Sequence, residues 1–355
     1  MKILILALSG IGDALMFTPA AKVIREKLPG VQIDAVVMFS GVKNIYDRTG
    51  LFDNVIHFDF MAEGAVKSLK FVLSLRGKYS HSISVYPSNR KEYNGIQWLA
   101  GAKSRGQVEY LRADGGNLGW LNNVRIREND SLHNVEENVL LVKKMFDLKE
   151  APLYPLQFPL NNDDLAFAEE YIKDNLKEGV TRIGFHPGCA TFKNHINRRW
   201  EPEKFAAIGR LLKEKHGFEL MLFGGPEEKE LREKIMSLAG SGVFHEPQTR
   251  SLSQSAALIK KCDLFVTNDS SLMHVSSAMG VKVLALIGPT NTSYIHPWMT
   301  DHKIVSLGLE CAPCFFYSPR PLQCSRTDVK YKCIREMGVE RVYDEIISFS
   351  GAEKS

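Results

Sequence analysis

An acidic side chain stands where a glycine turn meets a helix near the start of the chain. An apolar run at residues 3–8 leads into Ser9-Gly10-Ile11-Gly12-Asp13, and a helix is predicted over residues 14–28. A dinucleotide-binding loop carries a third glycine where this chain has Leu15. A carboxylate here would repel a phosphate, whereas the helix dipole would keep it ionised. The pattern therefore predicts that Asp13 is a general base rather than part of a phosphate loop.

A second polar cluster follows an apolar strand in the other half of the chain. Asp269, Ser270, Ser271 and His274 open a helix directly after the predicted strand at residues 264–267. Hydroxyls and free backbone N–H groups at such a point can hold a phosphate. The same residues could simply cap the helix, with Asp269 or Ser270 at the N-cap. These residues alone do not decide between a phosphate site and a helix cap.

Two further loops after predicted strands carry residue types that can bind a nucleotide, and the first of them begins at His186. His186 and Gly188 lead into Arg198 and Arg199, and paired arginines can neutralise a pyrophosphate. The alternative is a solvated basic turn. These loops and the one at residue 269 follow predicted parallel strands, whose carboxyl ends are where open α/β sheets bind ligands. Their coincidence favours a nucleotide site in the second half.

The other loop, after the strand predicted at 219–223, contains Gly225 and Glu227. An acid at this place can accept hydrogen bonds from two ribose hydroxyls. It could equally be a helix-start acid in a favourable dipole position. We expect Glu227 to contact the ribose.

Basic residues also flank a loop of the first half. Arg90, Lys91 and Arg105 lie around the loop at residues 86–89 and could meet an anionic acceptor. An ordinary solvated face explains them as well.

Four cysteines gather near the C-terminus, at positions 311, 314, 324 and 333. A C-x-x-C pair followed by two more cysteines can hold zinc. The later spacing is loose, so reduced thiols or a disulfide remain alternatives. Cys311, Cys314, Cys324 and Cys333 are thus candidates for a structural metal site.

The bulk composition bounds the class of protein. With 355 residues, the chain has room for about two domains. A net charge of +4 gives no argument for nucleic acid as a partner. No apolar stretch reaches the ~20 residues that cross a bilayer, and the first residues lack signal-peptide features. We therefore expect a cytoplasmic protein.

Strand and helix signals alternate in both halves, which predicts an α/β fold of two units, each with a parallel sheet. Prolines at 152, 155 and 159 mark the domain boundary. The predicted domains are residues 1–155 and 156–335. The first half is predicted to hold strands at 3–8, 33–39, 55–58 and 82–86, helices at 14–28, 91–99 and 131–146, and a loop at 112–130. The second is predicted to hold strands at 182–185, 219–223, 264–267, 281–287 and 303–307, and helices at 202–216, 227–238, 252–261, 271–279 and 339–349.

In their order along the chain, these motifs resemble glycosyltransferase family 9, the lipopolysaccharide heptosyltransferase family. The stretches that carry the resemblance are 9–13, 133–136, 184–188, 198–200, 223–227 and 268–274. The resemblance implies a GT-B fold, with an acceptor-binding domain at 1–155 and a nucleotide-sugar-binding domain at 156–335. It also implies that a C-terminal segment, 336–355, packs its helix back on the N-terminal domain.

The resemblance implies a role for each matching residue. Asp13 would be the general base, and the acceptor side would be lined by Ser9, Gly10 and Gly12. The donor would contact His186, Gly188, Arg198, Arg199, Gly225, Glu227, Asp269, Ser270, Ser271 and His274. Two positions depart from the family pattern. Arg198 stands where members often carry Lys, and Ser271 where they usually carry Gly.

The reaction implied is an inverting, metal-independent sugar transfer, with heptose moving from ADP-heptose to a lipopolysaccharide inner-core acceptor. The nucleotide sugar is then a substrate, no cofactor is expected, and the partners are the donor, an anionic glycolipid and the cytoplasmic face of the inner membrane. Alternatives are another GT-B enzyme such as a sugar-nucleotide epimerase, or a transferase with a different donor. A non-enzymatic nucleotide sensor is a third class, which the presence of Asp13 disfavours.

Overall fold

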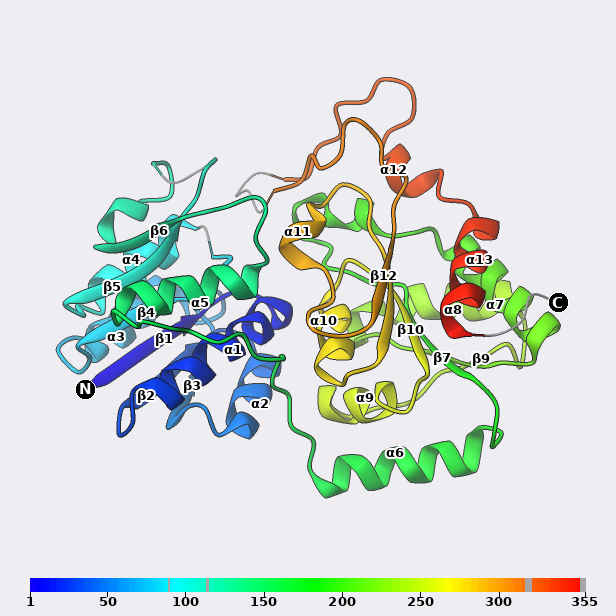
Figure 1. Ribbon diagram of the computed structural model, residues 1–355, viewed down its shortest axis with the longest axis horizontal. Helices are drawn as coiled ribbons and strands as arrows, with labels where there is room; N and C mark the ends of the chain where they lie inside the picture. The colour runs from blue at the N-terminus through cyan, green and yellow to red at the C-terminus, as the bar shows by residue number, and fades with distance from the viewer. Residues whose placement is uncertain (89, 113–114, 317–320, 352–355) are drawn as a thin grey trace. The chain divides into compact units, whose positions relative to one another are not determined.

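The computed structural model describes residues 1–88, 90–112, 115–316 and 321–351. The chain divides into two compact units (Figure 1). The first spans Met1–Pro159, and the second contains Leu160–Phe316 and the described residues from 321 onward. The division falls at the end of the proline-rich segment in which the sequence placed the domain boundary.

The first unit is built on one parallel sheet. Its strands are β1 (Lys2–Ala7), β2 (Gln32–Val37), β3 (Asn54–His57), β4 (His81–Ser84), β5 (Ser104–Glu109) and β6 (Val124–Arg127). They lie in the order β3-β2-β1-β4-β5-β6. At the centre, Ile5 of β1 pairs with Ala35 on one side and Ile83 on the other. Residues 3–8 are completely buried, as expected for a central strand covered on both faces.

The helices of this unit lie between the strands in sequence. They are α1 (Ile11–Lys27), α2 (Ser40–Thr49), α3 (Gly64–Leu75), α4 (Lys91–Leu99), the short 3-10 helix η1 (Gly119–Leu121) and α5 (Asn134–Met145). The start of α5 differs from the prediction: His133 is its N-cap, and its ring accepts a hydrogen bond from the Val135 amide. Ser131 instead lies in the preceding turn, where its amide bonds Asn129.

The polar stretch at 112–130 was predicted to be a loop, but it contains η1 and the edge strand β6. β6 reads Val-Arg-Ile-Arg, and none of its four residues is buried. An edge strand pairs on one side only, so it needs few apolar residues. Because β6 has few apolar residues, the sequence did not predict it as a strand.

The second unit repeats the architecture of the first. Its strands are β7 (Arg182–His186), β8 (Glu219–Leu222), β9 (Phe244–His245), β10 (Leu264–Asn268), β11 (Lys282–Leu286) and β12 (His302–Val305). Their order is β12-β11-β10-β7-β8-β9, all parallel. When β7 is matched to β1, this is the strand order of the first sheet, and both orders are Rossmann-like. The predicted fold class is confirmed.

The helices of the second unit complete its layers. They are α6 (Asn162–Asn175), η2 (Phe192–Arg198), α7 (Pro202–His216), η3 (Pro226–Glu228), α8 (Lys229–Ala239), α9 (Leu252–Ile259), α10 (Ser271–Ala278), α11 (Thr292–Ile295), α12 (Lys332–Arg335) and α13 (Val339–Ser350). Among the described residues, no helix has the length and apolar character needed to cross a bilayer.

The last helix contributes to the core of the second unit. That the helix of segment 336–355 also packs on the N-terminal domain stays a prediction. In the structure, Val342, Ile346 and Ile347 of α13 belong to the hydrophobic core of the second unit. Tyr343 also donates or accepts a 2.7 Å hydrogen bond with His216 at the end of α7. The apolar stripe of α13 is thus used within its own unit.

Candidate active site

Asp13 lies in the first turn of α1, directly after the carboxyl end of β1. Gly10 is the N-cap of this helix, and its amide donates a 3.2 Å hydrogen bond to Asp13 Oδ2. The carboxylate is half-buried. Its charge adds to the effect of burial in raising the pKa of Tyr46 and of Tyr93. The carboxylate therefore occupies the positive end of a helix, as the sequence predicted.

Among the small residues around Asp13, Ser9 has a side-chain hydroxyl that could contact a substrate. Ser9 is half-buried, and its Oγ has no hydrogen-bond partner among the described residues. Gly10 is exposed, whereas Gly12 is buried inside α1. A buried hydroxyl without a partner is costly unless a ligand completes it. Ser9 is therefore suited to a substrate contact, and Gly12 to the packing of α1.

In the second unit, His186 joins three strand-end loops. It is the last residue of β7, and its Nδ1 lies 2.8 Å from Ser270 Oγ, at the start of α10. Its Nε2 lies 3.0 Å from Glu228 Oε2, at the end of η3. Thr267 Oγ1 lies 3.1 Å from the same Ser270 hydroxyl. The loops after β7, β8 and β10 thus meet at one edge of the sheet.

Glu228 is the carboxylate that contacts His186 in this group of strand-end loops. Burial alone would raise its pKa, but the charge and hydrogen bond of His186 oppose this effect. The Gly225 amide, 2.9 Å away, and Arg199, 3.7 Å away, act in the same direction as His186. Together they lower the pKa of Glu228 to about 2. Glu228 is therefore ionised at neutral pH.

Two glycines provide the space that Glu228 occupies. A Cβ at Gly188 would overlap the Glu228 carboxylate, and one at Gly224 would lie 2.9 Å from Glu228 Oε2. Gly188 was predicted to contact the donor. In the structure it lets this carboxylate lie against the β7 loop.

Glu227, the predicted ribose ligand, is exposed at the same turn, and Gly225 is the exposed N-cap of η3. Glu228 was not among the predicted site residues. The two acids are adjacent in the chain, and only the turn of η3 decides which of them points toward His186.

An ion pair connects the other arginine to the start of α10. Arg198 Nη1 lies 2.5 Å from Asp269 Oδ2, and both side chains are 9% exposed. Thr290 Oγ1 donates to the same Asp269 oxygen at 2.7 Å. The Arg198 guanidinium also lies 5.3 Å from the centre of the Phe315 ring. Asp269 thus holds the Arg198 guanidinium in place, and Thr290 holds the Asp269 carboxylate in turn.

Arg199 points toward the β7 loop. Its Nη2 donates a 2.6 Å hydrogen bond to the carbonyl of Cys189. Its Nε is buried and has no partner among the described residues. The two predicted arginines therefore lie at the same strand-end loops as Glu228 and Asp269.

One buried histidine, His274, and one half-buried histidine, His195, are kept neutral beside these groups. Burial lowers the pKa of His274 on α10 to about 4, and its Nδ1 has no hydrogen-bond partner among the described residues. His195 has its pKa lowered to about 4, first by burial and then by Arg198, and its Nε2 is similarly unpartnered. Ser271 is half-buried as the first residue of α10. His195 was not among the predicted site residues, although its spacing from Arg198 could have indicated it.

Three basic residues of the first unit were predicted as possible contacts of an anionic acceptor. The Arg105 guanidinium donates to the carbonyls of Leu121 and Ala102 at 3.0 and 2.8 Å, so this residue holds backbone rather than an acceptor. Arg90 is half-buried with its guanidinium 5.9 Å from the Tyr93 ring centre, and Lys91 is exposed.

The four clustered cysteines are free thiols. The Cys324 Sγ accepts a hydrogen bond from the Tyr331 amide at 3.2 Å, and the Cys311 Sγ accepts one from Arg326 at 3.7 Å. Within the described parts of the chain, no group of three or more His, Cys, Asp or Glu is arranged to hold a metal ion. The geometry therefore gives no support to the zinc alternative.

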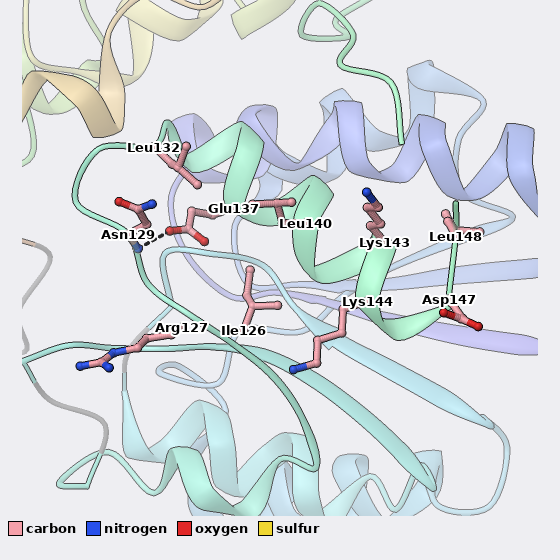
Figure 2. A pocket seen from close by; sticks show the side chains of 10 residues that line it. All are labelled: Ile126, Arg127, Asn129, Leu132, Glu137, Leu140, Lys143, Lys144, Asp147 and Leu148. Atoms are coloured by element: carbon pink, nitrogen blue, oxygen red, sulfur yellow. Dashed lines mark hydrogen bonds between the residues drawn. The ribbon is translucent and has the colours of Figure 1, made fainter. Parts of the chain in front are cut away.

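A hollow of about 440 Å³ lies in the first unit between β6 and α5 (Figure 2). Glu137 of α5 points toward Asn129, whose amide donates a 2.5 Å hydrogen bond to Oε1. Its Oε2 is buried without a partner among the described residues. Burial raises the pKa of Glu137 to about 7. The sequence analysis did not identify this residue.

Comparison with known proteins identifies the family. The profile of glycosyltransferase family 9 (heptosyltransferase) matches residues 96–323, which is more than half of the chain. This chain belongs to that family. It is therefore a glycosyltransferase, and the family resemblance seen in the sequence is confirmed.

Several relatives match over most of their length. Lipooligosaccharide heptosyltransferase 2 of Campylobacter jejuni is 26% identical over 99% of both chains. Lipopolysaccharide heptosyltransferase 2 of Escherichia coli is 25% identical, over 86% of this chain and 88% of its own. Among solved structures, the E. coli ADP-heptose lps heptosyltransferase II has a TM-score of 0.74 at 20% identity and covers 99% of this chain and 98% of its own. The fold is thus the two-domain GT-B fold of this family.

Proposed function

We propose that this enzyme transfers heptose from ADP-heptose to a lipopolysaccharide inner-core acceptor, with inversion and without a metal. Relatives of nearly full length are named lipopolysaccharide or lipooligosaccharide heptosyltransferase 2. One structure of the same fold is that of E. coli heptosyltransferase WaaC with ADP-2-deoxy-2-fluoro heptose. The observation that carries the proposal is the convergence of Arg198, Glu228 and Ser270 at one edge of the second sheet.

In this proposal the second unit holds the donor. When the bond to the anomeric carbon breaks, negative charge grows on the leaving diphosphate. Arg198 and Arg199 would stabilise that charge, together with the amides at the start of α10 and the Ser270 hydroxyl. His274 and Ser271, on the first turns of α10, would contact the donor's sugar or phosphates. The buried ring nitrogen of His274 is a suitable partner for a sugar hydroxyl.

We further propose that Glu228, rather than Glu227, accepts the hydrogen bonds of the ribose. Glu228 Oε2 is occupied by His186 and Gly225, whereas Oε1 lies 3.7 Å from Arg199, beyond hydrogen-bond distance. Its side chain is 14% exposed, so a ligand can still reach it. Glu227 is exposed at the same turn.

The first unit would hold the acceptor and supply the base. Asp13 takes the proton from the attacking hydroxyl as the hydroxyl oxygen bonds the anomeric carbon. The Gly10 amide occupies Oδ2, and Ser9 Oγ offers a second polar contact. Because the acceptor is an anionic glycolipid, the enzyme would work in the cytoplasm at the inner face of the membrane.

A thermal-shift screen tests the donor assignment. A ligand that binds only the folded state raises the melting temperature by mass action. We expect ADP-heptose to raise Tm and UDP- or GDP-linked sugars to leave it unchanged. A clear shift with the UDP- or GDP-sugars and none with any ADP-sugar would overturn the proposed donor.

A further inference from the structure

Helix α3 is apolar on two opposite sides, and only one of them is covered. Val72 and Leu75 are buried in the core of the first unit, and Phe71 stacks on Phe58 with ring centres 4.1 Å apart. Val66, Leu69 and Leu73 are exposed by 70%, 47% and 43%. At 100° per residue these three fall in one stripe, opposite the buried one. A helix of a water-facing surface normally carries polar residues there.

Exposed basic residues lie on and directly after the helix that carries this stripe. Lys67 and Lys70 are exposed on α3, and Arg76 and Lys78 are exposed directly after it. No acid occurs within α3, and Glu63, just before it, pairs with Lys67 at 2.9 Å. Exposed apolar residues beside lysines are the composition of helices that lie in a membrane interface.

An apolar groove adjoins this stripe. The groove, about 460 Å³, lies between α3 and α4 and is lined mainly by apolar side chains, among them Phe60, Leu69, Val72 and Ile96. Arg90, Glu92 and Tyr93 also line it. The charge of Asp13 contributes to raising the pKa of Tyr93, after burial. One surface of the first unit thus joins the exposed apolar residues of α3 to a groove that Arg90 and Tyr93 also line.

We propose that this surface, defined by Met61, Val66, Lys67, Leu69, Lys70 and Leu73, docks on an anionic lipid bilayer. The inference rests on the proposed function, in that the acceptor is an anionic glycolipid held in such a bilayer. Met61, 75% exposed, and the three stripe residues enter the interface, while Lys67 and Lys70 meet lipid phosphates. The groove then opens where the acceptor leaves the membrane.

Co-sedimentation with lipid vesicles tests this docking surface. The full chain is mixed with vesicles of phosphatidylcholine alone or with 30 mol% phosphatidylglycerol. We expect binding to the anionic vesicles that weakens with salt, and little binding to the neutral ones. The triple variant Val66→Gln, Leu69→Gln, Leu73→Gln should bind at least about tenfold more weakly. Lys67→Gln with Lys70→Gln should reduce the salt dependence.

The matched control is Leu238→Gln on α8 of the second unit, where Leu238 is 42% exposed. It should bind vesicles as the wild type does. Unchanged binding of the triple variant, or equal binding of the wild type to neutral vesicles, would overturn the proposal. So would a triple variant that differs from the wild type in oligomeric state without vesicles, because the surface would then join two copies.

An activity assay separates this proposal from the proposed function. The triple variant should retain heptose transfer to a deacylated, water-soluble acceptor and lose it with acceptor embedded in vesicles. Equal activity of variant and wild type on the embedded acceptor would contradict the docking surface. If the wild type transfers no heptose to either acceptor, the proposed function fails while the vesicle-binding result still decides the docking surface.

Discussion

At the scale of single residues, the account depends most on Asp13. Asp13→Asn keeps an oxygen for the Gly10 amide, so α1 should retain its N-terminal hydrogen bond. A general base contributes about 10²–10⁴-fold to rate, and Asn cannot take a proton. We expect kcat to fall by that factor with Tm within a few degrees of the wild type. A variant that turns over at close to the wild-type kcat would show that Asp13 is not the base.

A pair of adjacent acids gives a matched comparison at the donor site. Glu228→Gln removes the charge that pairs with His186 and Arg199, whereas Glu227→Gln changes an exposed side chain at the same turn. We expect Glu228→Gln to raise the donor KM by about tenfold or more, because hydrogen bonds to a charged group contribute about 1.5–3 kcal/mol. Glu227→Gln should change it less than about twofold. The opposite order, measured by steady-state kinetics, would return the ribose role to Glu227.

These two acids also show what the sequence can predict at this scale. The type of chemistry at each strand end was readable, because acids, hydroxyls and arginines follow buried strands. The choice between Glu227 and Glu228 was not readable, because it depends on the path of a three-residue turn. The hydrogen bond from Thr290 to Asp269 was not readable either. It joins two strand-end loops whose residues are 21 apart in the chain.

At the scale of elements, the β7 loop and η3 are fitted to each other. Gly188→Ala would place a methyl group where the Glu228 carboxylate lies, and so force it away from His186. We expect the donor KM to rise as in Glu228→Gln, with a loss of about 1–3 kcal/mol in stability from overpacking. Gly225→Ala is the control, because a Cβ there meets nothing within 4 Å. Calorimetric titration with ADP measures the affinity of the donor site in both variants. Equal affinity in Gly188→Ala and Gly225→Ala would contradict the packing of the β7 loop against Glu228.

Helix α5 carries a prediction about pH. Burial raises the pKa of Glu137 to about 7, from an ordinary 4.5. Between these values the folded chain holds a proton that the unfolded chain has released, so stability falls as pH rises through this window. The difference amounts to about 3 kcal/mol at most. Glu137→Gln should remove this part of the pH dependence.

Urea denaturation of the wild type and Glu137→Gln at pH 5 and pH 8 measures the effect. Glu150→Gln, an exposed acid after α5, is the control and should behave as the wild type. If Glu137→Gln loses as much stability as the wild type between the two pH values, Glu137 titrates normally and the account of this hollow is wrong.

Some of the elements that were not predicted from the sequence lack a clear hydrophobic pattern. α2 and α3 were not predicted, and α3 exposes much of its apolar surface, so its pattern has no clear polar face. β5 and β6 contain few apolar residues because they lie toward one edge of the sheet. The buried strands β1, β10 and β11, in contrast, were readable because both of their faces must be apolar.

At the scale of the whole molecule, one architecture is used twice for two tasks. Both sheets have the same strand order, and both place polar side chains at the carboxyl ends of their strands. In the first unit a carboxylate stands at the first helix start, and in the second a pair of arginines and hydroxyls stands at the equivalent edge. In our proposal, this shared topology supports a proton acceptor in one unit and an anion site in the other.

Product analysis with ADP-heptose and a lipopolysaccharide inner-core acceptor tests the central claim most directly. Mass spectrometry after incubation with the wild-type chain should show the acceptor heavier by one heptose, with release of ADP. Asp13→Asn, at the same concentration, should give almost none of this product. Release of free or epimerised sugar without any change in the acceptor would contradict the account and favour an epimerase-type reaction.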